Sequence, residues 1–175
     1  MDVMIDIETL GTSHSAVVLS IGAVKFDENK ILSEFYCVLD KNEQTTRSQD
    51  ISTLQWWAMQ ADEVRLALDK PTHTLKEALQ ELTNFLKTTE DRLYVWGNGS
   101  NFDICILENL YEYIHAPIPW KYRNVMDLRT FKRFVMPNYV MLATNEQKHN
   151  ALQDAKHQAL FVISKLQELA KVTRQ

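Results

Sequence analysis

The first eight residues alternate between apolar and polar positions, a pattern typical of a β-strand. The two faces of this strand differ in chemistry, with one carrying Val3, Ile5 and Ile7 and the other carrying Met4, Asp6 and Glu8. Residues 16–26 form an apolar run suited to a central strand, and residues 31–40 predict another strand after the polar turn at 27–30. The short connections between these segments predict an antiparallel three-strand meander.

From residue 52 the spacing of the apolar residues becomes helical. Residues 52–68 and 74–87 each carry apolar side chains three or four positions apart. In the second segment these side chains form a continuous stripe of leucines, Leu75, Leu79, Leu82 and Leu86. Both segments are therefore predicted to be amphipathic helices.

The rest of the chain alternates between short apolar runs and helical ones. Residues 92–99 predict a short strand that two glycines end, and residues 100–114 predict a helix with Ser100 or Asn101 as its N-cap. Residues 151–172 predict a long amphipathic helix. This order of elements predicts an α/β fold, a mixed β-sheet flanked by α-helices, in a single domain over residues 1–175.

The composition excludes several classes of protein. The 175 residues are 45% hydrophobic and 24% charged, as in an ordinary globular protein. No apolar run reaches the roughly 18 residues of a membrane span, and no basic segment precedes an apolar one at the N-terminus, so neither a membrane span nor a secretory signal is expected. Cys37 and Cys105 lie in apolar segments, which predicts buried, reduced thiols in a cytoplasmic protein.

The net charge of −4 argues against a protein that holds nucleic acid by electrostatics alone. One segment, residues 121–133, is nevertheless locally basic, because it contains Lys121, Arg123, Arg129, Lys132 and Arg133. Its single acid, Asp127, is interpreted as a capping residue before a helix. The basic side chains form either a solvated helix face or a rim that faces the phosphates of a substrate.

Asp6 and Glu8 are unusual because they lie within an apolar strand. Residues two apart on a strand point the same way, about 6.6 Å apart at roughly 3.3 Å per residue. The two carboxylates therefore project from one face, and Gly11 follows closely enough to let the backbone turn beside a ligand. The acids either reach water at the strand end or share a cation, because two like charges are costly to bury without one.

Two further segments carry acids at the start of a helix. Asp103 follows a strand directly, so it is either a capping acid or part of a site at the carboxyl end of that strand. His149 and Asp154 would lie about 140° apart on an ideal helix. They converge only if His149 lies on the entering loop and Asp154 one turn in, which the loop-like segment 136–150 permits; otherwise both are surface residues.

Four carboxylates on three segments, each at a strand end or helix start, predict a shared cation site. Oxygen ligands favour Mg²⁺ or Mn²⁺ over Zn²⁺. Two such ions about 3.5–4 Å apart stabilise the attacking and leaving oxygens of a phosphoryl displacement. A histidine beside them is suited to take a proton from the attacking water. The expected chemistry is metal-assisted phosphodiester hydrolysis.

Three motifs resemble, in order and spacing, those of the DEDDh 3′–5′ exonucleases, the DnaQ-like branch of the ribonuclease H-like fold. They are Asp6-Ile7-Glu8-Thr9, Asn101-Phe102-Asp103 and His149-x-Ala151-x-x-Asp154. The resemblance implies four metal-binding carboxylates, Asp6, Glu8, Asp103 and Asp154. It also implies that Asp6 bridges two Mg²⁺ or Mn²⁺ ions and that His149 is the general base.

The resemblance further implies where the substrate lies. The backbone around Thr9 and Leu10 is expected to hold the 3′-terminal nucleotide. Other candidate substrate contacts are Asn101, Phe102, Arg129 and Trp57.

Residues 55–60 and 123–130 are similar to a compact bacterial and phage subgroup that includes exoribonucleases and exodeoxyribonucleases. The first of these segments contains the adjacent residues Trp56 and Trp57. One indole is expected in the core, and the other against a base or at a homodimer interface.

The expected function is a metal-dependent 3′–5′ exonuclease that acts on the 3′ ends of single-stranded RNA or DNA. It would release nucleoside 5′-monophosphates, with RNA slightly preferred. A non-catalytic nucleic-acid-binding module and a metal-stabilised interaction domain on the same fold are the alternatives.

Overall fold

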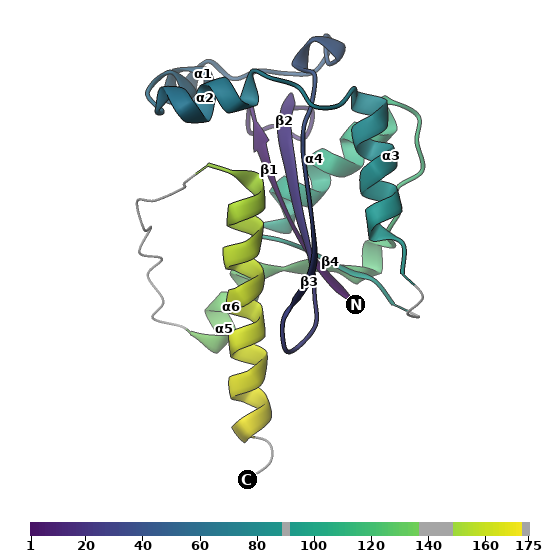
Figure 1. Cartoon of the computed structure of the whole chain (residues 1–175), viewed down its shortest axis with the longest axis vertical. Helices are drawn as coiled ribbons and strands as arrows, with labels where there is room; N and C mark the ends of the chain where they lie inside the picture. The colour runs from purple at the N-terminus through teal and green to yellow at the C-terminus, as the bar shows by residue number, and fades with distance from the viewer. Residues whose placement is uncertain (89–91, 137–148, 173–175) are drawn as a thin grey trace.

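The computed structural model describes residues 1–88, 92–136 and 149–172. A mixed sheet lies at its centre, with the strand order β3-β2-β1-β4-β5 (Figure 1). The strands are β1 (Asp2–Thr9), β2 (Val18–Phe26), β3 (Ile31–Val38), β4 (Tyr94–Gly97) and β5 (Val125–Asp127). The β1–β2 and β2–β3 pairs are antiparallel, whereas β1–β4 and β4–β5 are parallel. The predicted meander and mixed sheet are confirmed, and β5 is an addition that no pattern predicted.

The helices are α1 (Ile51–Ala58), α2 (Asp62–Leu68), α3 (Leu75–Leu86), α4 (Ser100–Tyr113), α5 (Leu128–Val135) and α6 (Ala151–Val172), with short 3₁₀ turns η1 (Lys41–Glu43) and η2 (Tyr122–Asn124). The helix expected over residues 52–68 is therefore two helices. Met59 and Gln60 donate to carbonyls three residues back, which tightens and ends α1. Asp62 and Glu63 begin α2, where acids complement the helix dipole.

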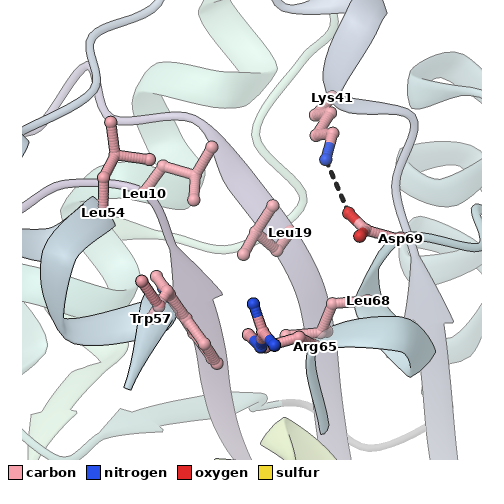
Figure 2. Close-up of a pocket in the computed structure, with 9 residues that line it drawn as sticks. Leu10, Leu19, Lys41, Leu54, Trp57, Arg65, Leu68 and Asp69 are labelled. Atoms are coloured by element: carbon pink, nitrogen blue, oxygen red, sulfur yellow. Dashed lines mark hydrogen bonds and ion pairs between the residues drawn. The ribbon is translucent and has the colours of Figure 1, made fainter. Parts of the chain in front are cut away.

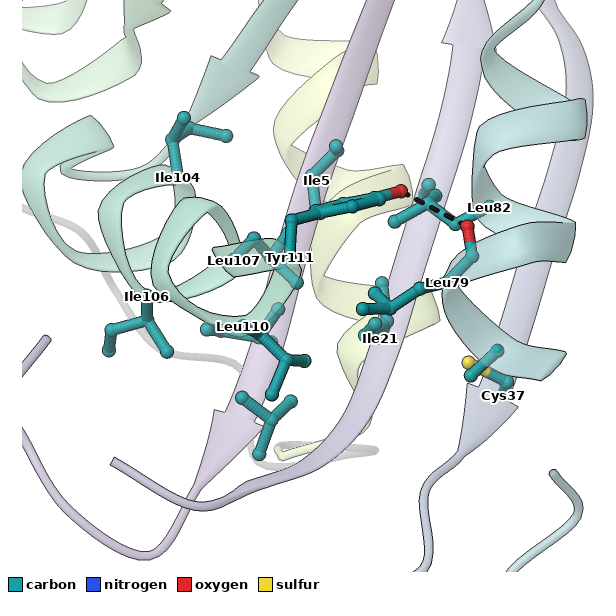
Figure 3. Close-up of a cluster of buried hydrophobic side chains, with 14 of the residues drawn as sticks. Ile5, Ile21, Cys37, Leu79, Leu82, Ile104, Ile106, Leu107, Leu110 and Tyr111 are labelled. Carbon is teal, nitrogen blue, oxygen red and sulfur yellow. Dashed lines mark hydrogen bonds between the residues drawn. The ribbon is translucent and has the colours of Figure 1, made fainter. Parts of the chain in front are cut away.

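The two faces of the sheet are covered by different helices (Figure 1). On one face, α3 and α4 pack over Val3, Ile5 and Ile7 of β1. Figure 3 shows Tyr111 and the leucines of these helices meeting Ile5 and Ile21. The leucine stripe predicted for α3 is buried here at all four positions. On the other face, α6 packs over Met4 and Val24 through small and branched side chains.

Gly22 sets the close approach of α6 to the sheet. A Cβ on this residue would lie 2.2 Å from the carbonyl carbon of Ala151, so only glycine admits the first turn of α6 against β2. In the β1–β2 ladder, Gly22 lies opposite Asp6. The beginning of α6, with Asp154 one turn in, is thereby brought next to the acidic face of β1.

The start of α4 differs from the prediction. Its N-cap is Gly99, with φ of 105°, rather than Ser100 or Asn101. The backbone N–H of Ser100 instead donates to Asp127 Oδ2 at 2.6 Å. Asp127 also caps α5 by accepting from the N–H of Thr130 at 2.7 Å, which confirms its predicted role. One carboxylate thus serves the first turns of two helices.

The two cysteines are both free but differ in environment. Cys37 is buried in the core under α3 and α4, as predicted. Cys105 is exposed, so its predicted burial is wrong, because the residue lies on the solvent-facing side of α4. Within the described ranges, no helix combines the length and apolar character that crossing a membrane requires.

Candidate active site

The end of strand β1 carries the first two acids of the site. Asp6 is partly buried and Glu8 is 9% exposed, and both project from the face that α6 covers. Asp154 reaches the same place from the first turn of α6. Carboxylate oxygens of Asp6, Glu8 and Asp154 all lie within 4.8 Å of one another, a spacing at which they could hold one cation.

Asp103 completes the group from the first turn of α4. Its side chain is 3% exposed, and Oδ1 accepts a long hydrogen bond of 3.4 Å from the N–H of Ile7. Gly97 permits this position, since a Cβ there would lie 3.3 Å from Asp103 Oδ2. We call the four carboxylates the acidic centre: Asp6, Glu8, Asp103 and Asp154.

Burial raises the pKa of every member of the acidic centre, and repulsion between carboxylates adds to the shift for Asp6 and Glu8. Burial contributes most to the raised pKa of Asp6, followed by repulsion from Asp103, Glu8 and Asp154. Burial, then repulsion from Asp154 and Asp103, raises the pKa of Glu8 to about 8. Burial raises that of Asp103 to about 7, although the N–H of Ile7 and the charge of Arg129 oppose the shift. Burial also raises the pKa of Asp154, against the charge of His149.

Repulsion at Asp6 and Glu8 favours a cation at the acidic centre. Asp6 accepts one hydrogen bond of 2.7 Å from Gln158 Nε2, and the oxygen of the same amide is buried without a donor among the described residues. Carboxylates supplied by three elements fit hard divalent cations such as Mg²⁺ or Mn²⁺. The residues present therefore fit a divalent metal site.

His149 lies just before α6, with Asp154 one turn inside the helix, as the spacing predicted. The backbone of His149 is in the left-handed region, with φ of 70°, which is unfavourable for a residue with a side chain. Its ring packs edge to face on Trp56, with centroids 4.5 Å apart, and more loosely on Trp57 at 6.2 Å. Helix α1 thus holds the histidine at the acidic centre. Most of the predicted loop 136–150 lies outside the described residues.

The turn after β1 is held by hydrogen bonds from several elements. The Leu10 N–H donates to Val17 O at 2.9 Å, and the Asp50 N–H donates to Leu10 O at 2.8 Å. Trp57 Nε1 donates to Thr9 O at 2.8 Å. The backbone groups of Leu10 are therefore already paired within the protein. Any contact of this turn with a nucleotide has to use its remaining atoms.

The structure places Trp57, not Trp56, in the core, which is contrary to the assignment of Trp57 to the substrate. Trp57 is 7% exposed and packs with Leu10, Val17 and Leu19. It is the core indole and a support for the turn after β1. Trp56 is half-buried, so part of its indole remains accessible to solvent.

The other candidate substrate residues lie around Asp103. Asn101 is exposed on the first turn of α4, and Phe102 is half-buried against the core. Arg129 is exposed on α5, and its guanidinium lies against Gly99, where a Cβ would be 3.0 Å from Cζ. Its positive charge acts on Asp103. Arg129 is thus a basic residue of segment 121–133 that lies beside the acidic centre.

Sequence reasoning missed three residues that shape the site. Gln158 contacts Asp6, Trp56 contacts His149, and Gly22 admits α6. A signal was available for Gln158, because it lies four residues after Asp154 and so on the same helix face. Nothing in the sequence pointed to Gly22 or distinguished Trp56 from Trp57.

A cavity of about 240 Å³ lies behind the turn after β1, between β2 and helices α1 and α2. Figure 2 shows Leu10 and Trp57 on one side of it and the 2.6 Å ion pair between Lys41 and Asp69 on another. None of the acidic centre lines this cavity. It is therefore separate from the candidate active site.

Comparison with known proteins gives a family match and several structural matches. A model of the 3′-5′ exoribonuclease Rv2179c-like domain matches residues 1–165. No curated protein gives a significant match.

Similar solved structures include Exonuclease X in complex with 5′ overhanging duplex DNA, at 16% identity and a TM-score of 0.60, covering 96% of this chain and 92% of that one. The nuclease domain of 3′hExo, a DEDDh family member bound to rAMP, is 12% identical with a TM-score of 0.65, covering 95% of this chain and 92% of that one. Cell-death related nuclease 4 is 13% identical with a TM-score of 0.62, covering 98% of this chain and 64% of that one. At these identities the likeness shows the ribonuclease H-like fold.

Proposed function

Because this chain belongs to the family of 3′-5′ exoribonuclease Rv2179c-like domains and is a 3′–5′ exonuclease, we propose that it removes nucleoside 5′-monophosphates from single-stranded 3′ ends by a two-metal mechanism. RNA is proposed as the slightly preferred substrate, in keeping with the family's description. The observation that carries the proposal is the acidic centre, in which four carboxylates from β1, α4 and α6 converge and repulsion raises the pKa of Asp6 and Glu8.

The acidic centre would hold two Mg²⁺ or Mn²⁺ ions, with Asp6 as the shared ligand. Asp6 suits this role because its pKa responds to all three of the other carboxylates. When bound, such cations activate water and stabilise the charge that develops on the attacking and leaving oxygens.

His149 is proposed as the general base that accepts the proton of the attacking water. Its ring packs edge to face on Trp56, and the residue lies close enough to Asp154 to influence that carboxylate. The proton would move to a ring nitrogen of His149 and from there to solvent. The unfavourable backbone conformation of His149 supports a functional role, since such strain is concentrated at active sites.

The 3′-terminal nucleotide is proposed to lie between the Thr9–Leu10 turn and the start of α4, where Asn101 and Phe102 offer contacts. Arg129 would contact a phosphate next to Asp103, since it is the exposed cation beside that acid. The nucleic acid in Exonuclease X and the rAMP in 3′hExo support a nucleic-acid end as the ligand. A homodimer stays a prediction.

Hydrolysis of two matched oligonucleotides tests the proposal. RNA and DNA strands of one sequence are labelled at the 5′ end and incubated with the protein in Mn²⁺ or in EDTA. We expect shortening from the 3′ end one nucleotide at a time in Mn²⁺ only, with nucleoside 5′-monophosphates as products and RNA degraded somewhat faster. Binding of the strands without cleavage would instead identify a non-catalytic module. Cation-dependent stabilisation with neither binding nor cleavage would identify a metal-stabilised interaction domain.

A further inference from the structure

Gln158 is the side chain through which helix α6 holds Asp6. It lies one turn beyond Asp154, and its Nε2 donates to Asp6 Oδ1 at 2.7 Å. An ionised carboxylate can only accept hydrogen bonds, so the amide nitrogen, not the oxygen, has to face Asp6. The bond joins residues 152 positions apart in the sequence and crosses from α6 to β1.

This orientation leaves the amide oxygen of Gln158 in an unfavourable position. Oε1 is buried and has no donor among the residues that the structure describes. An unsatisfied buried acceptor costs about 1–3 kcal/mol, and an apolar side chain of similar length would avoid that cost. The glutamine is therefore a poor choice for packing alone. A donor that arrives with a hydrated cation would satisfy the oxygen.

The hydrogen bond also limits the orientation of the Asp6 carboxylate. The hydrogen bond from Gln158 to Oδ1 restrains rotation of the carboxylate, while Oδ2 and the second lone pair of Oδ1 remain available. Without that restraint, repulsion from the other carboxylates favours rotation of Asp6 away from the acidic centre. Partners that orient a metal ligand in this way affect affinity and turnover without touching the substrate.

We propose that Gln158 is a positioning residue of the acidic centre, whose amide N–H fixes Asp6 and whose amide oxygen accepts a donor that enters with the divalent cation. The inference rests on the proposed function, because it requires a metal site at the acidic centre. It goes beyond that function by assigning a role to a residue outside the three motifs.

The test compares two substitutions of glutamine by methionine on the same helix. Gln158→Met keeps the length of the side chain and removes both polar atoms. Gln167→Met is the matched control, because Gln167 Nε2 donates, within the described part of the chain, to the backbone oxygen of Glu28 in an exposed hydrogen bond far from Asp6. Mn²⁺ affinity is measured by isothermal titration calorimetry, kcat and KM on a labelled RNA strand at saturating Mn²⁺, and the melting temperature in EDTA.

We expect Gln158→Met to weaken Mn²⁺ binding by about 10- to 100-fold and to lower kcat with little change in KM. Its melting temperature in EDTA should change little, since the loss of the hydrogen bond to Asp6 and the removal of an unsatisfied acceptor act in opposite directions. Gln167→Met should match the wild type in all three measurements.

Three outcomes would overturn the inference or its premise. Unchanged Mn²⁺ affinity and kcat in Gln158→Met would show that Gln158 does not position Asp6. A large fall in melting temperature in EDTA, or failure to fold, would show that it serves packing instead. If the wild-type protein itself binds no Mn²⁺, the proposed function fails, and that result is distinct from a wild type that binds and a variant that binds equally well.

Discussion

The two faces of strand β1 have opposite roles although they alternate along the same eight residues. Val3, Ile5 and Ile7 are almost fully buried under α3 and α4 and belong to the largest core cluster. On the other face, Met4 packs on α6, but Asp6 and Glu8 face further carboxylates. One face of the strand therefore stabilises the fold, whereas the other brings like charges together and lowers the stability of the metal-free protein.

The cost on the acidic face is visible in the raised pKa of its members. The protein can fold despite this destabilisation because the other face buries a continuous apolar surface, which contributes roughly 25 cal/mol to the free energy of unfolding for each Å². A slip of one residue in the pairing of β1 would exchange the two faces. The register of Asp6 with Gly22 is therefore essential to both.

The largest expected effect comes from removing the base on the acidic side. His149→Ala should lower kcat by about 10²- to 10⁴-fold, because general-base catalysis typically contributes that much. Its Mn²⁺-dependent thermal stabilisation should persist. The exposed His14→Ala variant is the control and should retain wild-type turnover. Wild-type turnover in His149→Ala would refute the base assignment.

On the apolar face the expected effect is on stability instead. Ile5→Ala should lower the free energy of unfolding by about 2–5 kcal/mol, because Ile5 is 0% exposed and the cavity cannot collapse fully. The matched Ile51→Ala, at a residue 75% exposed, should change it by at most about 0.5 kcal/mol. Urea unfolding in EDTA measures both. Equal losses in the two variants would contradict the contrast between the faces.

The pH dependence of the metal-free protein should report on the acidic face. In the folded state the pKa of Glu8 is about 8, against an ordinary value of 4.5, so the folded chain binds more protons than the unfolded one between these limits. Stability in EDTA should therefore rise as the pH falls from about 8 to about 5. Saturating Mn²⁺ should reverse or remove this slope, because cations replace protons. Melting curves that show greater stability at pH 8 than at pH 6 in EDTA would count against the account.

The smallest expected effect concerns the support of the base by α1. Trp56→Ala should lower kcat about 2- to 12-fold, the equivalent of the 0.5–1.5 kcal/mol typical of an aromatic pair. Met59→Ala, at an exposed residue just after α1, is the control for general disturbance of this helix. A change confined to KM would indicate that Trp56 stacks on the substrate and does not position His149.

The sequence predicted the long periodic elements well. Strands β1 and β2 and helices α3, α4 and α6 follow from apolar spacing, because each has a face in the core, and β3 follows from the short turn that joins it to β2. Strand β5, with three residues, is too short to show a period and exists through its pairing with β4. Gly99 replaced the expected caps of α4 because Asp127, 27 residues from Ser100 along the chain, supplies the acceptor. Such a tertiary contact leaves no local signal.

In the candidate site, too, the features with a local sequence signal could be predicted and those set by tertiary contacts could not. The acids and His149 could be recognised because their residue types and spacing carry chemistry. The helical period indicates that Trp56 and Trp57 point in different directions, but it does not indicate which of the two faces the core. The hydrogen bond from Gln158 depends on how α6 packs against the sheet. Gly22, which is far from α6 in the sequence, permits that packing.

The most direct test of the account is the melting temperature of Asp6→Asn beside that of the wild type at pH 8, with EDTA and with saturating Mn²⁺. Removing one charge relieves the repulsion but also removes the shared ligand, so the order of stability should invert. We predict that Asp6→Asn melts above the wild type in EDTA and below it in Mn²⁺, with hydrolysis lost. A variant that melts below the wild type in EDTA, or that gains as much from Mn²⁺ as the wild type does, would contradict the claim that the acidic face is destabilised in order to hold metal.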